Sequence, residues 1–266
     1  VVLHLLDNTG GQILYHGEDV TTVSREKLSA LRREMQIIFQ DPFSSLNPRM
    51  TVYQTIAEPM QIIGGYTRAQ IEERVSEMMD IVGLAARFVN SYPHELDGGR
   101  RQRIGIARAL VLNPKFVVCD EPVSALDVSI QAQVLNLMLD IQERMGLTYI
   151  FITHDLSVVK YISNDIMVMY LGQMVEKAPA DELFKHRYHP YTRALISAVP
   201  IPDIDHKRER IQLKGELTSP INPKPGCFAA RCIYAKPECF EVNPEIEEIT
   251  PGHFVRCHCV RELNNL

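Results

Sequence analysis

The pattern of apolar and polar positions predicts strands and helices that alternate along most of the chain. Short apolar or β-branched runs predict strands at residues 12–16, 35–39, 116–119 and 148–153. Apolar residues at helical spacing predict helices at residues 52–63, 68–79, 104–112 and 128–145. Later runs predict a hairpin of residues 166–170 and 173–176, followed by short helices at 181–186 and 191–199. This pattern favours an α/β fold built on a parallel sheet.

Residues 116–119 are followed by two adjacent carboxylates, Asp120 and Glu121. Open α/β sheets bind ligands at the carboxyl ends of their strands, so Asp120 can hold Mg²⁺ while Glu121 orients or deprotonates a water. Taken alone, the same residues fit a strand that ends in an exposed acidic turn. The neighbouring motifs favour the first interpretation.

Three further motifs surround these carboxylates. Gln40 ends a predicted strand and opens DPFSSLNPRMTV, which its Pro, Ser and Asn residues predict to be a loop. Leu96–Arg103 (LDGGRRQR) precedes a predicted helix, and His154 follows a predicted strand. Each motif has a structural alternative. Gln40 fits an ordinary polar residue at a strand end, the arginines of Leu96–Arg103 fit a solvated basic helix face, and His154 fits a structural histidine.

Composition narrows the class of protein. The chain has 266 residues, of which 45% are hydrophobic, enough for one large domain and a smaller one. The net charge of −5 shows no basic excess, which argues against nucleic acid as the main partner. No apolar run is long enough for a membrane helix, and the first residues lack the pattern of a signal peptide, so we expect a cytosolic protein.

In their order and spacing these motifs resemble the ATP-binding-cassette (ABC) ATPase family. The resemblance implies a RecA-like P-loop NTPase core of ABC type with an inserted α-helical subdomain and a small Cys-rich C-terminal extension. The expected parts are residues 1–50 (first part of the core), 51–113 (helical subdomain with the signature motif), 114–200 (second part of the core) and 201–266 (extension).

The resemblance also implies roles for individual residues. Asp120 would hold Mg²⁺, Glu121 would act as the base, and Gln40 and His154 would position water and the γ-phosphate of ATP. Segment 124–127 (SALD), ending in Asp127, would run along a dimer interface, although Asp127 can equally be a helix N-cap.

The signature segment would complete the site of a second ATPase subunit through Gly98 and Gly99, whose backbone can approach an anion at a helix start. The chain departs from the family pattern L-S-G-G-Q at Asp97 and Arg100. A carboxylate repels phosphate, so we expect a weakened composite site in which Arg100 offsets part of the charge of Asp97.

The phosphate-binding loop of the family, G-x-x-x-x-G-K-[ST], does not occur in this sequence. That loop supplies most of the affinity for ATP. We expect the sequence to be part of a longer chain, because Gly11–Asp19 presupposes strands and a helix before it. The alternative is a chain that starts at Val1 and cannot hold ATP in its own site.

Five cysteines occur in the last forty residues, which in a cytosolic protein indicates metal before disulfides. The spacing of Cys227, Cys232, Cys239 and Cys257 resembles that in the C-terminal extension of oligopeptide-importer ATPases. The sequence segments KPGCF and PGHFVRCH strengthen this resemblance. Four thiolates can hold an iron–sulfur cluster or zinc. The resemblance implies a 4Fe-4S cluster, with zinc as the alternative, and Cys259 could compete with Cys257 as the fourth ligand.

The sequence segment FQDPFSSLNPRMTV further resembles the oligopeptide and dipeptide importer branch of this family. This implies an ATPase subunit, peripheral on the cytoplasmic face of the membrane, that uses ATP and Mg²⁺ to energise peptide import. Its partners would be a second ATPase subunit, identical or paralogous, transmembrane permease subunits and, indirectly, an extracytoplasmic peptide-binding protein. The alternatives are a catalytically impaired or structural partner in an asymmetric dimer, a soluble non-transport ABC ATPase, and a regulatory role for the cysteine-rich tail.

Overall fold

A computed structural model of the chain describes residues 1–199, 210–216 and 225–266. The chain divides into two compact units, Val1–His154 and Asp155–Leu266. The boundary expected between residues 200 and 201 lies outside the described residues.

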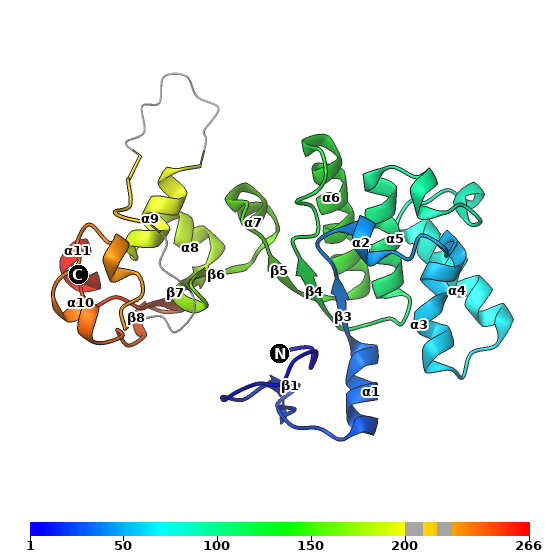
Figure 1. Cartoon of the computed structure of the whole chain (residues 1–266), viewed down its shortest axis with the longest axis horizontal. Helices are drawn as coiled ribbons and strands as arrows, with labels where there is room; N and C mark the ends of the chain where they lie inside the picture. The colour runs from blue at the N-terminus through cyan, green and yellow to red at the C-terminus, as the bar shows by residue number, and fades with distance from the viewer. Residues whose placement is uncertain (200–209, 217–224) are drawn as a thin grey trace. The chain divides into compact units, whose positions relative to one another are not determined.

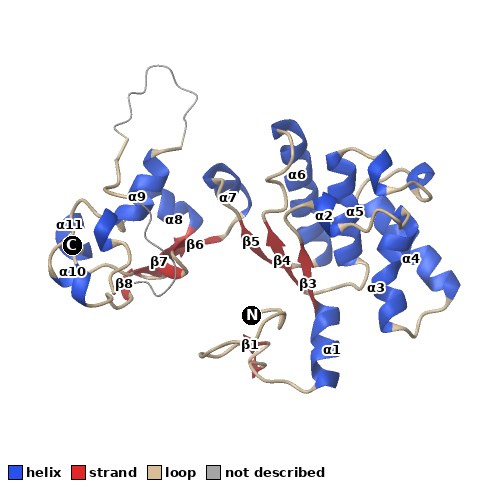
Figure 2. Cartoon of the chain, viewed as in Figure 1, coloured by secondary structure: helices blue, strands red, loops and turns tan. Residues whose placement is uncertain are grey.

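The first unit contains a three-stranded parallel sheet in the order β3-β4-β5 and several helices (Figures 1 and 2). Its strands are β1 (Leu14–Tyr15), β2 (Glu18–Asp19), β3 (Met35–Ile38), β4 (Phe116–Asp120) and β5 (Thr148–Ile152). Its α-helices are α1 (Arg25–Glu34), α2 (Pro42–Ser45), α3 (Val52–Ile63), α4 (Arg68–Ile81), α5 (Gly98–Leu110) and α6 (Val128–Met145). β1 and β2 form a separate antiparallel pair, so the strand predicted at 12–16 is shorter than expected.

The middle strand β4 is paired on both sides, with β3 and with β5. Val117 and Cys119 on this strand are completely buried, as the apolar run predicts for a central parallel strand. Because all three strands are parallel, their carboxyl ends lie at one edge of the sheet.

The helices α3, α4 and α5 pack against one another. Thr51 and Thr67 begin α3 and α4 with a capping box, each with a glutamine three residues later. Gly64 ends α3 with a positive φ of 74°, a conformation that glycine adopts without strain. The predicted helices at 52–63 and 68–79 are therefore confirmed.

The segment after Gln40 was expected to be a loop throughout, and this expectation is wrong at its start. Pro42–Ser45 forms the short helix α2. The Asp41 carboxylate accepts hydrogen bonds from the backbone N–H groups of Phe43 and Ser44, at 2.8 and 3.3 Å. Asp at the N-cap and Pro at the first helical position are helix-start signals that outweighed the loop-like composition.

The second unit contains an antiparallel sheet in the order β6-β7-β9-β8. Its strands are β6 (Asp165–Tyr170), β7 (Gln173–Pro179), β8 (Glu247–Thr250) and β9 (His253–Val255). Its α-helices are α7 (Leu156–Ile162), α8 (Ala180–Lys185), α9 (Pro190–Ser197), α10 (Glu238–Glu241) and α11 (Val260–Asn264). The hairpin β6–β7 was predicted, whereas the tail strands β8 and β9 were not.

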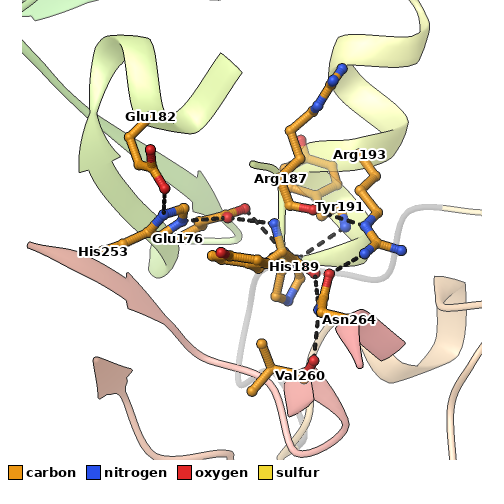
Figure 3. A network of polar contacts seen from close by, with 10 residues as sticks. Glu176, Glu182, Arg187, His189, Tyr191, Arg193, His253, Val260 and Asn264 are labelled. Carbon is orange, nitrogen blue, oxygen red and sulfur yellow. Dashed lines mark hydrogen bonds and ion pairs between the residues drawn. The ribbon is translucent and has the colours of Figure 1, made fainter. Parts of the chain in front are cut away.

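A buried carboxylate, Glu176 on β7, joins three segments of this unit (Figure 3). It accepts hydrogen bonds from the backbone N–H groups of Tyr188 and His189, at 2.8 and 3.1 Å. Its other partner is the ring of His253 on β9, at 2.8 Å. Glu176 and His253 are both completely buried, so the pairing holds the C-terminal strand to the hairpin.

Across the parts of the chain that the structure describes, no helix is long and apolar enough to cross a membrane.

Candidate functional site

Three of the predicted catalytic residues meet at the carboxyl edge of the parallel sheet. Gln40 follows β3, Glu121 follows β4 and His154 follows β5. The Glu121 carboxylate accepts a hydrogen bond from Gln40 Nε2 at 2.8 Å through one oxygen. Its other oxygen lies 2.9 Å from Nδ1 of His154. Gln40 and His154, which are 81 and 33 positions away from Glu121 in the sequence, therefore form one cluster around its carboxylate.

The backbone at Glu121 is unusual for a residue other than glycine. Its φ is +43°, in the left-handed region. Its N–H still donates to the carbonyl of Ile152 at 2.9 Å, while its own carbonyl accepts from Ser124 Oγ at 3.1 Å. Strained backbone of this kind is concentrated at functional sites, and here it turns the chain as β4 ends.

The neighbours of Glu121 keep its side chain ionised. The hydrogen bond from His154 is the main cause that lowers the pKa of Glu121, with smaller contributions from Ser124 and Gln40. The His154 side chain is 75% exposed, so its ring remains accessible to a ligand. An ionised carboxylate between two polar side chains can orient a water molecule for attack.

Asp120 is the last residue of β4 and is partly buried. It is directly adjacent to Glu121 in the chain. A carboxylate at this strand end suits Mg²⁺, which binds through one or two carboxylates together with phosphate oxygens.

The signature residues form a different group, at the start of α5. Asp97 is the N-cap of this helix, as expected, and accepts a hydrogen bond from the Arg100 N–H at 2.8 Å. The second carboxylate oxygen of Asp97 pairs with the Arg100 guanidinium at 2.6 Å. The carboxylate expected to repel phosphate is thus already paired within its own helix.

Gly98 and Gly99 pack closely on α6 and the segment before it. A Cβ at Gly99 would lie 2.7 Å from Cγ2 of Ile130, and one at Gly98 would lie 3.3 Å from Cδ2 of Leu126. These glycines therefore have a packing reason besides the predicted access for an anion. Asp127 occupies the N-cap position of α6, but its side chain makes no capping hydrogen bond.

The four predicted metal ligands lie in the second unit and line one cavity of about 60 Å³, together with His189, Arg256 and other residues. These four are Cys227, Cys232, Cys239 and Cys257. Cys259 is buried but does not belong to the lining. Burial raises the pKa of Cys257 to about 12, so its thiol is protonated at neutral pH.

The metal site itself is not confirmed. Within residues 1–199, 210–216 and 225–266, no three His, Cys, Asp or Glu side chains form a group that could hold a metal ion.

Gly226 has a role that the sequence analysis missed. Its φ is +64°, and a Cβ there would lie 1.6 Å from the carbonyl oxygen of Cys239. Its N–H donates to Oδ1 of Asn243 at 2.8 Å. The absence of a side chain thus lets the Cys227 segment approach the Cys239 segment, and a glycine directly before a cysteine is the signal that could have indicated this.

Comparison with known families gives two matches. Residues 1–124 match the family described as ABC transporter. Residues 175–239 match the family described as oligopeptide/dipeptide transporter, C-terminal region.

Curated relatives resemble nearly the whole chain. The putative oligopeptide transport ATP-binding protein YkfD of Bacillus subtilis is 52% identical over 265 residues, covering 98% of this chain and 80% of the relative. AppF, an oligopeptide transport ATP-binding protein of the same organism, is 54% identical, covering 97% of this chain and 79% of its own length. OppF of Escherichia coli, another oligopeptide transport ATP-binding protein, is 52% identical. The match covers 92% of this chain and 75% of the relative.

Two solved structures are similar in fold. CbiO1 of Clostridium perfringens, part of the ABC transporter complex CbiONQ, aligns with a TM-score of 0.63 and 27% identity, covering 70% of this chain and 72% of that chain. The second is the ATP-binding cassette MJ0796, in a dimeric post-hydrolysis state bound to ADP and Pi. It aligns with a TM-score of 0.57 and 26% identity, covering 65% of this chain and 74% of that chain.

Proposed function

The chain belongs to the ATP-binding proteins of ABC transporters, and from this premise we propose that it is the ATP-hydrolysing subunit of an importer for oligopeptides or dipeptides. The observation that carries the proposal is the cluster of Gln40, Glu121 and His154 at one sheet edge. The names of the relatives supply the class of substrate.

Each residue of the cluster has a chemical task. Glu121 accepts a hydrogen bond from the attacking water and, as the ionised base, takes its proton. Gln40 holds the second oxygen of Glu121 and so fixes the direction of the carboxylate. Because phosphoryl transfer needs mainly positioning and charge stabilisation, this geometry provides what the protein must contribute at the water.

His154 would contact the γ-phosphate through Nε2, since Nδ1 faces Glu121. If the N–H at Nδ1 donates a hydrogen bond to the carboxylate, Nε2 can donate a hydrogen bond to a phosphate oxygen only when the ring carries both protons. Asp120 would hold Mg²⁺, which neutralises charge on the phosphates.

The signature residues Asp97, Gly98, Gly99 and Arg100, together with Asp127, would serve the site of a second ATPase subunit, identical or paralogous. The inserted subdomain would be residues 51–113, and permease subunits would be driven as two such ATPases close and open. We place the subunit peripherally on the cytoplasmic face of the membrane, with an extracytoplasmic peptide-binding protein as an indirect partner.

We further propose that the cysteine-rich extension holds a 4Fe-4S cluster. Four thiols that line one cavity support a shared ligand set, and we adopt the cluster over zinc because the spacing of these cysteines resembles the C-terminal extension of oligopeptide-importer ATPases. Cys257 lines the cavity and Cys259 does not, which supports Cys257 as the fourth ligand. When bound, such a group would link the ends of the extension.

The test is Glu121→Gln in the transporter reconstituted in liposomes. We expect peptide-stimulated phosphate release to fall at least 100-fold, because the amide cannot accept the proton of water. ATP binding should persist, since the change leaves Asp120 in place. Glu143→Gln, an exposed glutamate on α6, is the matched control. Hydrolysis at the original rate in the Glu121 variant would contradict the proposed role.

A further inference from the structure

Gln40 lies beyond the end of its strand, so its position depends on the segment that follows. β3 ends at Ile38, and Asp41 is already the N-cap of α2. The Asp41 carboxylate accepts hydrogen bonds from two backbone N–H groups of that helix. The contacts that hold α2 in place therefore also place Gln40, whose side chain donates to Glu121 at 2.8 Å.

Arg101 of α5 holds α2 through an aromatic ring. The two helices pack against each other (Figure 1). Cζ of Arg101 lies 3.8 Å from the centroid of the Phe43 ring, close enough for a cation–π contact. Nε of the same side chain donates to the carbonyl of Pro93 at 2.6 Å. Arg101 is only 8% exposed although it is charged, so these two contacts fix its guanidinium against α2.

Arg108 lies two turns further along α5, on the same face of the helix. Its Nη1 donates to the carbonyl of Ser45, the last residue of α2, at 2.7 Å. Its Cζ lies 5.8 Å from the centroid of the ring of Phe39, the residue directly before Gln40. Arg108 therefore contacts the chain on both sides of Gln40.

We propose that Arg101 and Arg108 are positioning residues for ATP hydrolysis. They hold residues 39–45 against α5 and thereby place Gln40 at the Glu121 carboxylate. This inference rests on the proposed role of Gln40 and Glu121 in hydrolysis. Because α5 begins at the signature segment, the same contacts connect the Glu121 cluster with that segment of the chain.

The first experiment measures ATP hydrolysis by the assembled transporter with Arg108→Met, which removes the charge and the donors of the side chain. We expect kcat to fall about tenfold with an unchanged KM for ATP, because a misplaced Gln40 affects the attack of water rather than the binding of nucleotide. Arg108→Lys keeps the charge and a donor, so it should recover part of the rate.

A double variant shows whether Arg108 acts through Gln40. Gln40→Ala removes the side chain that Arg108 is proposed to place, so adding Arg108→Met should cause little further loss. An arginine that only stabilised the fold would lower the rate by the same factor in both backgrounds. Equal factors would overturn the inference.

Arg74→Met is the matched control. Arg74 on α4 also donates to backbone carbonyls at the end of α5, those of Leu110 and Val111, at 3.3 and 3.0 Å. These partners lie outside residues 39–45, so we expect kcat to stay close to that of the wild type. A loss as large as that of Arg108→Met would show that loosening α5 explains both effects, which would also overturn the inference.

Hydrogen exchange of the complete chain without nucleotide tests the placement of the segment itself. The Ser45 N–H donates to the Asp41 carbonyl at 3.1 Å, so its exchange reports on α2. We expect exchange in residues 39–46 to be several-fold faster in Arg108→Met than in the wild type, because the contact with the Ser45 carbonyl is lost. Arg74→Met should match the wild type.

Phe43→Leu keeps the inference testable if Arg108→Met does not fold. It removes the ring over which Arg101 lies, at a position where the side chain is exposed. We expect the same faster exchange in residues 39–46. Unchanged exchange in either variant that folds would overturn the inference, even where ATP hydrolysis is normal. A wild-type transporter that hydrolyses no ATP would instead overturn the proposed function.

Discussion

Glu121 illustrates at the scale of one residue what the sequence could and could not show. The Asp-Glu pair after an apolar run predicted a carboxylate at a strand end, and the structure places it there. Its φ of +43° and its two simultaneous side-chain partners depend on strands far apart in sequence. Neither could be inferred from the local pattern.

The paired carboxylate of Asp97 leads to a prediction about the signature segment. We expect Asp97→Ser to raise ATP hydrolysis in the assembled transporter about tenfold, equivalent to roughly 1.4 kcal/mol, because it removes a negative charge from the segment that we propose completes the phosphate site of a second subunit. Arg100→Gln should lower hydrolysis, because it leaves Asp97 without its partner at 2.6 Å. The measurement is the rate of phosphate release.

The double variant Asp97→Ser/Arg100→Gln separates charge from geometry. If the ion pair matters, the two single effects should not add, since each variant changes the partner of the other. Rates that are equal in all four proteins would show that the pair has no influence on the composite site.

His189 gives a prediction for the pH dependence of stability. Burial lowers the pKa of His189 to about 4. The unfolded chain therefore binds a proton between about pH 6.5 and pH 4 that the folded chain does not bind, so stability falls as the pH decreases through this window. The loss should be roughly 2 kcal/mol between pH 7 and pH 4.5. Urea unfolding of the metal-free protein measures it.

The matched variant is His189→Asn, which keeps an acceptor for the Tyr191 N–H but does not titrate. We expect its stability to decrease less over the same pH range. Identical pH profiles for the two proteins would contradict a neutral, buried His189.

At the scale of elements, sequence patterns predicted the strands and helices of the first unit better than those of the tail. The helices α3 and α6 have the predicted bounds, because long runs at helical spacing and a glycine directly after each last residue define them, and a capping box also marks the start of α3. The strands β8 and β9 are only four and three residues long. They are specified by the pairing of β9 with β7, by the pairing of β8 with β9, and by the buried contact of His253 with Glu176, which local patterns do not contain.

The close approach of Gly226 to Cys239 predicts how the extension responds to one added methyl group. We expect Gly226→Ala to reduce metal retention strongly, because its Cβ would overlap the Cys239 carbonyl oxygen at 1.6 Å. Iron and sulfide content per chain after anaerobic purification is the measurement.

Gly252→Ala is the control for backbone strain. Gly252 also has a positive φ, +77°, but a methyl group at this position would lie 3.9 Å from its nearest neighbour, an atom of Pro179. Both variants share the cost of a left-handed residue, about 1 kcal/mol, so only the overlap differs. Equal metal content in the two variants would show that the contact with Cys239 is unimportant.

At the scale of the whole molecule, the chain divides into two compact units, and each contains a cluster of buried hydrophobic residues. A cluster in the first unit contains Val20, Leu31 and Met35, and the cluster in the second unit, called the second core below, includes Tyr170, Leu183 and Phe228. Cys227 and Cys232 pack against the second core. Chains with two such units commonly unfold in more than one step.

This division predicts where removal of the proposed metal group acts. A ligand that binds only the folded state stabilises the part that holds it, so chelation should destabilise residues 155–266 and leave residues 1–154 unchanged. Hydrogen exchange of the complete chain, with and without chelator, measures this by segment. We expect faster exchange in β7 and β9, which lie beside the cysteines, and no change in β3, β4 or β5. Loss of protection in the parallel sheet as well would show that the two units unfold together, and the cysteine-rich extension would then support the ATPase core directly.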